Sequence, residues 1–218
     1  QQNRVCEGDS VPNQILAKGK HVVILGGGDT GSDCLGTSNR HGAAMVHQFE
    51  LLPRPPDERT DEMPWPYWPM IMRTSSSQEE GVERDFSVNT KKLVGDADGN
   101  VKELHAVKLQ WKLDSSGQRR MEEVPGSEFV LKADLVLLAL GFVGPEKSVP
   151  EQLGAKLTDR GNVPVDESYM TSVPGVFSCG DMRRGQSLVV WAIWEGREAA
   201  RGVDAYLMGQ TDLASSPM

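Results

Sequence analysis

The chain has 218 residues, which is enough for one large domain or two small ones with a buried core. Its formal net charge of −8 argues against a protein that binds nucleic acid or an anionic membrane surface, since both attract positive patches. No apolar run approaches the roughly 20 residues that cross a bilayer, no signal-peptide pattern opens the chain, and the three cysteines are widely spaced. We therefore expect a protein of a reducing compartment, either the cytoplasm or the interior of an organelle.

The first part of the chain divides into three segments. Residues 1–19 are polar and weakly patterned, and we interpret them as a linker. Residues 20–52 follow the order strand, glycine turn, helix and strand. Residues 53–85 form an irregular insertion rich in proline, tryptophan and charge, which either packs as a rigid flap over the core, the interpretation we favour, or docks a partner region. The side chains available for either role are Trp65, Tyr67, Trp68 and Met70.

Strand character returns between residues 86 and 141. Asp98-Gly99 predicts a hairpin, and "FVLKADLVLLALGF" predicts one buried strand that ends in glycine. Farther on, "GVFSCGD" predicts a short strand, and a long helix is expected from about Ser187 to Met208. We expect "HVVIL", "AMVHQFEL" and "ADLVLLAL" to lie side by side in a parallel sheet flanked by helices.

A glycine motif follows the first predicted strand. The spacing G-x-G-x-x-G after consecutive apolar residues is typical of a dinucleotide-binding turn. In such a turn the first glycine permits the tight bend, the second lets a pyrophosphate approach the backbone, and the third lets the helix pack closely on the strand. The helix then directs its N-terminal amides at the phosphates. The predicted binding residues here are Gly26, Gly27, Gly28, Asp29, Thr30 and Gly31.

The end of the second strand predicts which nucleotide binds. Glu50 lies 19 residues after Gly31, where an acid accepts hydrogen bonds from the adenosine ribose hydroxyls and repels a 2′-phosphate. Arg54 is close enough in sequence to reach a phosphate, but prolines flank it. We therefore expect NADH or NADPH to bind and favour NADH. Right-handed crossovers should bring Leu140 and Gly141 to the same edge of the sheet.

The stretch "VPGVFSCGDMRRGQSLVVWAIWEGREAARGVDAYL" resembles the closing segment of flavoproteins that bind two dinucleotides. The resemblance implies that Asp181, after Gly180, contacts the ribityl–phosphate part of FAD. It also implies that the start of the following helix lies near the flavin pyrimidine. Arg183 and Arg184 either assist a phosphate or solvate the loop. The residues implied at the helix start are Gln186, Ser187, Leu188 and Val189.

Two longer blocks, "VVILGGGDTGSDCLGTSNRHGA" and "FSCGDMRRGQSLVVWAIWEGREAARGVDAYLMG", are similar to the small (β) subunit of NAD(P)H-dependent glutamate synthase, or to the equivalent C-terminal region. "FELLPRPPDER" followed by "PWPYWP" resembles the fused NADH-type enzymes. The resemblance covers about residues 20 to 210. It implies an α/β fold in which a Rossmann-like, three-layer, parallel-sheet NAD(P)-binding domain (20–144) is followed by the C-terminal part of a split FAD-binding domain (145–218).

The resemblance implies a reductase activity. Hydride passes from NAD(P)H to FAD, and electrons continue through iron–sulfur centres toward the synthesis of glutamate from glutamine and 2-oxoglutarate. The implied partners are the other half of the FAD domain and the iron–sulfur and glutaminase–synthase portion. Because the chain holds one glycine fingerprint, we expect a fragment that is inactive alone and purifies without colour.

Two alternatives stay open at this point. One is the NAD(P)H-binding module of a related flavin reductase, dihydropyrimidine dehydrogenase-like or ferredoxin-reductase-like. The other is a non-catalytic nucleotide-binding interaction domain, against which the intact glycines argue. We expect no catalytic acid or base and no metal site, because the four histidines are scattered through strand and helix patterns.

Overall fold

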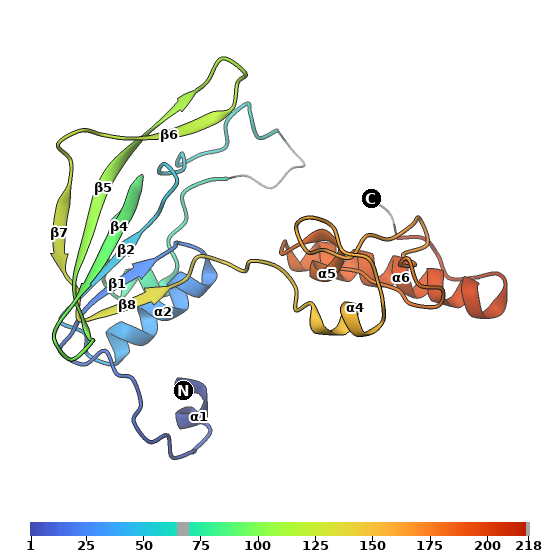
Figure 1. Ribbon diagram of the computed structural model, residues 1–218, viewed down its shortest axis with the longest axis horizontal. Coiled ribbons are helices and arrows are strands. Elements are labelled where there is room, and N and C mark those ends of the chain that lie inside the picture. Colours follow the sequence, from blue (N-terminus) through green and yellow to red (C-terminus); the bar gives the residue numbers. More distant parts are fainter. Residues whose placement is uncertain (65–69, 217–218) are drawn as a thin grey trace. The chain divides into compact units, whose positions relative to one another are not determined.

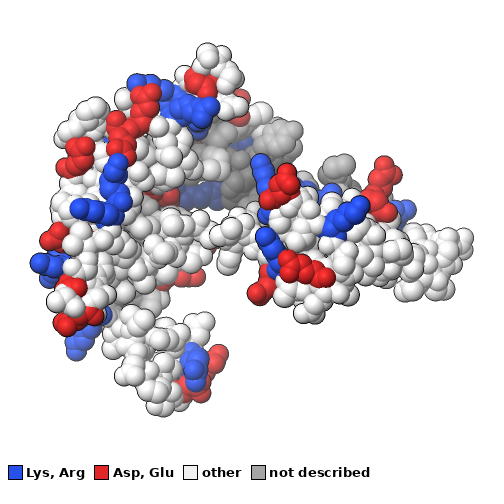
Figure 2. All heavy atoms as spheres, viewed as in Figure 1, with Lys and Arg blue, Asp and Glu red and all other residues white. Residues whose placement is uncertain are grey.

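The computed structural model describes residues 1–64 and 70–216 (Figure 1). It divides into two compact units, Gln1–Gly141 and Phe142–Met218, and each is described by itself. Within the described residues, no helix is both long enough and apolar enough to span a membrane. On the face seen in Figure 2, basic and acidic side chains are interspersed over both units.

A four-stranded parallel sheet forms the centre of the first unit. Its two middle strands bury four and three of their five residues respectively, as expected for strands covered on both faces. The three strands that we expected side by side are adjacent, in parallel register, which confirms that prediction. In spatial order the strands are β3 (Glu83–Asp85), β2 (Met45–Phe49), β1 (His21–Leu25) and β8 (Leu135–Leu138).

Helix α2 (Asp29–Arg40) covers one face of this sheet. Leu35 packs against Val22 and Ile24, and all three side chains are fully buried. Alternate residues of a strand point to opposite faces, so Val23 and Leu25 face the other way. Those two belong to a separate apolar cluster with residues of a second sheet.

The second sheet is antiparallel and covers the other face of the parallel sheet. Leu104 and Ala106 from its long strand pack with Val23 and Leu25. The layers are therefore helix, parallel sheet and antiparallel sheet, whereas we predicted helices on the flanks of the parallel sheet. Its strands are β4 (Val88–Gly95), β5 (Val101–Leu113), β6 (Arg119–Glu123) and β7 (Phe129–Lys132), and β5 pairs with the other three.

The segment "FVLKADLVLLALGF" is not one strand, which corrects our prediction. Its first part is β7, antiparallel to β5, and its second part is β8, parallel to β1. The change occurs at Ala133 and Asp134, because the Ala133 N–H donates to Lys102 of the antiparallel sheet (3.0 Å). Asp134 instead accepts a hydrogen bond from the N–H of His21, which begins β1 (2.9 Å).

The predicted hairpin at Asp98-Gly99 is confirmed between β4 and β5, where the Asp96 carboxylate accepts from the N–H of Asp98 (2.9 Å). Two segments that we predicted to be irregular contain regular structure. Helix α1 (Gln2–Cys6) lies in the presumed linker. Helix α3 (Ser76–Glu79) and strand β3 lie in the Pro/Trp-rich insertion. Of the aromatic side chains considered there, Trp65, Tyr67 and Trp68 lie outside the described residues.

The described residues of the second unit, up to residue 216, contain three helices, α4 (Ser148–Gln152), α5 (Asp181–Arg184) and α6 (Val189–Met208). Helix α6 begins two residues later than predicted and ends at Met208, as predicted. Its C-cap, Gly209, is left-handed (φ +79°), as a glycine at this position commonly is. The predicted strand "GVFSCGD" is absent from the described structure. Only an isolated bridge between Met170 and Phe177 forms, because the chain turns back tightly between them.

Candidate nucleotide-binding site

The turn between β1 and α2 is built from glycines that the geometry requires. Gly26 has φ +113°, and a methyl group there would overlap the carbonyl oxygen of Ala139, which follows β8. A methyl group at Gly31 would overlap the Gly26 carbonyl and would lie 2.8 Å from the amide nitrogen of Gln48. The turn therefore fits tightly against the ends of β2 and β8, as expected for a dinucleotide-binding fingerprint.

The middle glycine is different, because it faces open space. Gly28 is the N-cap of α2, and a methyl group there would meet nothing within 4 Å. Residues other than glycine can adopt its backbone dihedrals (φ −73°, ψ −172°) without strain. The absence of a side chain at Gly28 therefore leaves room above the turn and is not needed to relieve backbone strain. No side chain caps α2, so its first N–H groups are available to an anion. Asp29 and Thr30 are exposed at the start of this helix.

Glu50 lies directly against the turn. It follows β2, and a methyl group on Gly27 would overlap its carboxylate. The backbone of Glu50 is fixed, since its N–H donates to Asp85 of β3 (2.9 Å) and its carbonyl accepts from Val88 (3.0 Å). Burial raises the pKa of the Glu50 carboxyl, and the nearby positive charge of Arg84 partly opposes this. An acid is thus held at the end of the second strand, where we predicted it.

Two arginines near this edge have different surroundings. Arg54 is exposed and forms an ion pair with Asp57 (2.6 Å), so its guanidinium already has a partner. Arg84 on β3 donates to the carbonyl of Arg73 (3.0 Å), but its buried Nε has no hydrogen-bond partner among the described residues. We missed Arg84 because β3 lies in a segment that we predicted to be irregular.

A cavity of about 410 Å³ adjoins the glycine turn and lies within the first unit. This is within the usual size range of a small-molecule pocket. One wall comes from the turn and the start of α2, and the other comes from the segment before α3 and from β3. The lining residues are Gly27, Asp29, Ser32, Ile71, Arg73, Thr74, Ser75, Gln78 and Arg84. Leu140 and Gly141 follow β8 at the same edge, and the Leu140 side chain is exposed.

In the second unit, a buried carboxylate organises the Gly-Asp pair. Glu195 of α6 has no exposed surface and accepts the backbone N–H of Gly180 (2.8 Å). It also accepts from Arg183 Nη1 (2.7 Å) and Arg184 Nε (2.8 Å). The two arginines therefore pair with Glu195, a role that we had not considered. Asp181 is exposed as the first residue of α5. Sequence reasoning missed Glu195 because a helix is usually charged on its outer face.

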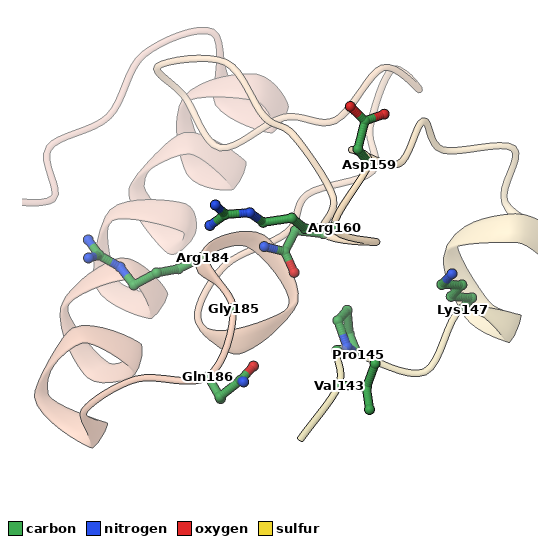
Figure 3. A pocket seen from close by; sticks show the side chains of 10 residues that line it. Val143, Pro145, Lys147, Asp159, Arg160, Arg184, Gly185 and Gln186 are labelled. Carbon is green, nitrogen blue, oxygen red and sulfur yellow. The ribbon is translucent and has the colours of Figure 1, made fainter. Parts of the chain in front are cut away.

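The residues predicted near the flavin pyrimidine surround the start of α6. Gln186 donates from Nε2 to the carbonyl of Phe142 (2.7 Å), while Ser187 and Leu188 precede the helix and Val189 opens it. No side chain caps α6, which leaves its first N–H groups available. Figure 3 shows Arg184, Gly185 and Gln186 beside a cavity of about 650 Å³ that Val143, Pro145, Lys147, Asp159 and Arg160 also line.

Metal and thiol chemistry receive no support from the described residues. They hold no group of three or more histidine, cysteine, aspartate or glutamate side chains able to bind a metal ion. Burial raises the pKa of Cys34 and of Cys179, and in each case a neighbouring carboxylate adds to the effect. Both thiols are therefore poor nucleophiles at neutral pH.

Comparison with known proteins identifies the family. The family model described as pyridine nucleotide-disulphide oxidoreductase matches residues 1–196. The chain belongs to this family. Solved structures share its fold: Mycobacterium tuberculosis FprA in complex with NADPH superposes with a TM-score of 0.61 at 14% identity, covering 88% of this chain and 54% of that one. The crystal structure of T. acidophilum thioredoxin reductase gives a TM-score of 0.56 at 22% identity, covering 88% of this chain and 53% of that one.

Relatives within the family confirm the resemblance to glutamate synthase. The chain is 56% identical over 217 residues to the protein named glutamate synthase [NADPH] small chain of Mycobacterium tuberculosis, covering 97% of this chain and 43% of the relative. It is 48% identical over 208 residues to glutamate synthase [NADH] of Schizosaccharomyces pombe, covering 92% of this chain and 10% of the relative. The chain thus spans less than half the length of either relative.

Proposed function

We propose that this chain is part of the reductase portion of a glutamate synthase, which accepts hydride from NAD(P)H. The observation that carries the proposal is the glycine turn with Glu50 against it, beside a helix whose first N–H groups are uncapped. The names of the relatives support the same activity. When bound, the flavin supplies the hydride acceptor, and the protein orients the two cofactors.

The glycine turn and the residues next to it suit different parts of the nicotinamide dinucleotide. The space above Gly28 and the start of α2 suit the pyrophosphate, since backbone N–H groups and the helix dipole attract it. The Glu50 carboxylate suits the adenosine ribose and repels a 2′-phosphate. Because Arg54 is paired with Asp57, we propose that NADH is preferred to NADPH. Arg84 is the side chain that would favour NADPH if this preference were reversed.

The second unit supplies residues that fit a flavin. Gly180 adopts φ 63°, and α6 has an uncapped start beside the cavity at Gln186. We propose that Asp181 and the start of α6 contact FAD, and that other portions of the enzyme complete the flavin site and carry the iron–sulfur and glutaminase–synthase chemistry. The three cysteines are free, which supports a reducing location such as the cytoplasm or an organelle interior.

The complete protein, assembled with its partner portion, provides the test. We expect NADH oxidation to require both glutamine and 2-oxoglutarate and to yield glutamate in proportion. Oxidation of NADH that is independent of both substrates but is coupled to another acceptor would refute this function and favour a related flavin reductase.

A further inference from the structure

Two buried glutamine side chains lie at the nucleotide pocket: Gln78 is one of its lining residues, and Gln48 is bonded between Gln78 and the glycine turn. Gln48 of β2 is 1% exposed and Gln78 of α3 is 7% exposed. Polar amides at such depth destabilise a protein unless they are hydrogen-bonded. Both amides are hydrogen-bonded, and their bonds form a continuous series from Gly26 through Gln48 and Gln78 to Ser75, which we call the glutamine relay.

At one end, the glutamine relay reaches the glycine turn. Gln48 Nε2 donates to the carbonyl oxygen of Gly26 (3.2 Å). The N–H of Gly26 donates in turn to the carbonyl of Phe49, the next residue of β2 (2.9 Å). The turn is therefore tied to β2 through both its carbonyl and its N–H group, so a change at Gln48 alters the turn directly.

The second part reaches the opposite wall. Gln78 Nε2 donates to Gln48 Oε1 (2.9 Å), and Gln78 Oε1 accepts from the N–H of Ser75 (2.8 Å). Ser75 Oγ accepts from the N–H of Gln78 (3.3 Å), which completes a capping box on α3. Ser75 follows Arg73 and Thr74 along this wall, so the relay joins the two walls of the cavity.

We propose that Gln48 and Gln78 are positioning residues that hold the glycine turn and the segment 73–75 at the separation a dinucleotide requires. The inference rests on the proposed nucleotide site and adds the elements that shape it. The ligand part concerned is the adenosine–pyrophosphate moiety, because both walls belong to that part of the pocket. Neither glutamine is proposed to contact the nucleotide.

A double-mutant cycle in the full chain tests the relay. Gln48→Met and Gln78→Met keep the length of each side chain and remove its hydrogen bonds. Each variant should raise the Kd of NADH, and that of ADP-ribose, by about tenfold (about 1.4 kcal/mol) in calorimetric titration. Because either change breaks the same relay, the double variant should also show about tenfold weakening. The exposed Gln110→Met, on β5, is the matched control and should leave both values unchanged.

A second variant and a second measurement allow the relay to be tested even if a methionine variant folds poorly. Gln78→Glu retains the acceptor for Ser75 but removes the donor to Gln48, and it should weaken ADP-ribose binding similarly. In all relay variants, amide hydrogen exchange in the ligand-free protein should quicken at residues 27–29 and 73–75 together. A Kd about a hundredfold higher in the double variant, as independent effects would give, or unchanged Kd values in the single variants, would overturn the proposal. Failure of the unmodified chain to bind either nucleotide refutes the proposed function instead.

Discussion

At the scale of single residues, the ionised form of the Glu50 carboxyl is less stable than that of a carboxyl exposed to solvent. Its side chain is half-buried against a backbone turn, and burial raises its pKa despite the neighbouring charge of Arg84. Ribose hydroxyls that donate hydrogen bonds to the ionised carboxylate would compensate for this cost. A residue that is unfavourable in the free protein and favourable in the complex is expected at a binding site.

The pH dependence of binding follows from this pKa. In the proposed complex it is the ionised form of Glu50 that accepts hydrogen bonds from the ribose. NADH affinity should therefore be fully developed above the raised pKa and should fall as the pH drops through it, by at most about tenfold per pH unit. Calorimetry between pH 8 and pH 5 measures this decline. Glu50→Gln should bind NADH more weakly at pH 8 and should remove the Glu50 contribution to the decline. An identical pH profile in the variant contradicts the assignment.

Glu195 allows a prediction about stability. Glu195→Ala leaves Arg183 and Arg184 without their shared carboxylate and leaves the Gly180 N–H without its acceptor. We expect the free energy of unfolding to fall by about 3 kcal/mol, toward the lower end for a broken buried ion pair because both arginines are partly exposed. Urea denaturation measures the change, with the exposed Arg197→Ala on the same helix as the control. Equal stability of the two variants would count against a structural role for Glu195.

At the scale of elements, the β1–turn–α2 unit was predictable because its determinants are local. The apolar run, the glycine spacing and the helix that follows lie within about 20 consecutive residues, and each glycine meets the constraint that its position implies. By contrast, β3, α3 and the division of "FVLKADLVLLALGF" depend on partners far away in the sequence. For example, β3 has only three residues and is defined by its pairing with β2. Such pairing has no local signature.

The glycines of the turn should respond differently to the same substitution. Gly26→Ala should lower the free energy of unfolding by about 2 kcal/mol or more, because of its positive φ and the overlap with Ala139. Gly28→Ala should lower the free energy of unfolding by only about 0.5–1 kcal/mol, because alanine is a poorer N-cap than glycine. It should nevertheless weaken NADH binding by about tenfold or more, because the methyl group occupies the open space. Gly196→Ala in α6, where an added methyl group also meets nothing within 4 Å, is the control for nucleotide binding and should leave the Kd of NADH unchanged. Undiminished nucleotide affinity in Gly28→Ala argues against a pyrophosphate at this position.

At the scale of the whole molecule, the parallel sheet was predicted, and the glycine turn and Glu50 lie at the edge of it where we expected the candidate site, but the other residues brought to that edge were not predicted. Glu50 could be proposed from the sequence because it stands at a fixed distance from the glycine motif. Arg84, Gln78 and Glu195 come from other segments, and only the folded chain brings them beside Glu50, Gln48 and Gly180 respectively. The antiparallel sheet that covers the face where we expected a helix was missed for a similar reason. The sequence predicted strands between residues 86 and 141, but it did not show which face of the parallel sheet they cover.

The central claim is that the glycine turn and Glu50 form a nicotinamide dinucleotide site that prefers NADH. Calorimetric titration of the unmodified chain and of Glu50→Ala with NADH and with NADPH tests it most directly. We predict tighter binding of NADH than of NADPH by the unmodified chain. The substitution should weaken NADH binding by about ten- to a hundred-fold (about 1.5–3 kcal/mol), because a carboxylate with two hydrogen bonds is lost. Tighter binding of NADPH by the unmodified chain, or an unchanged Kd for NADH in the variant, would contradict the account.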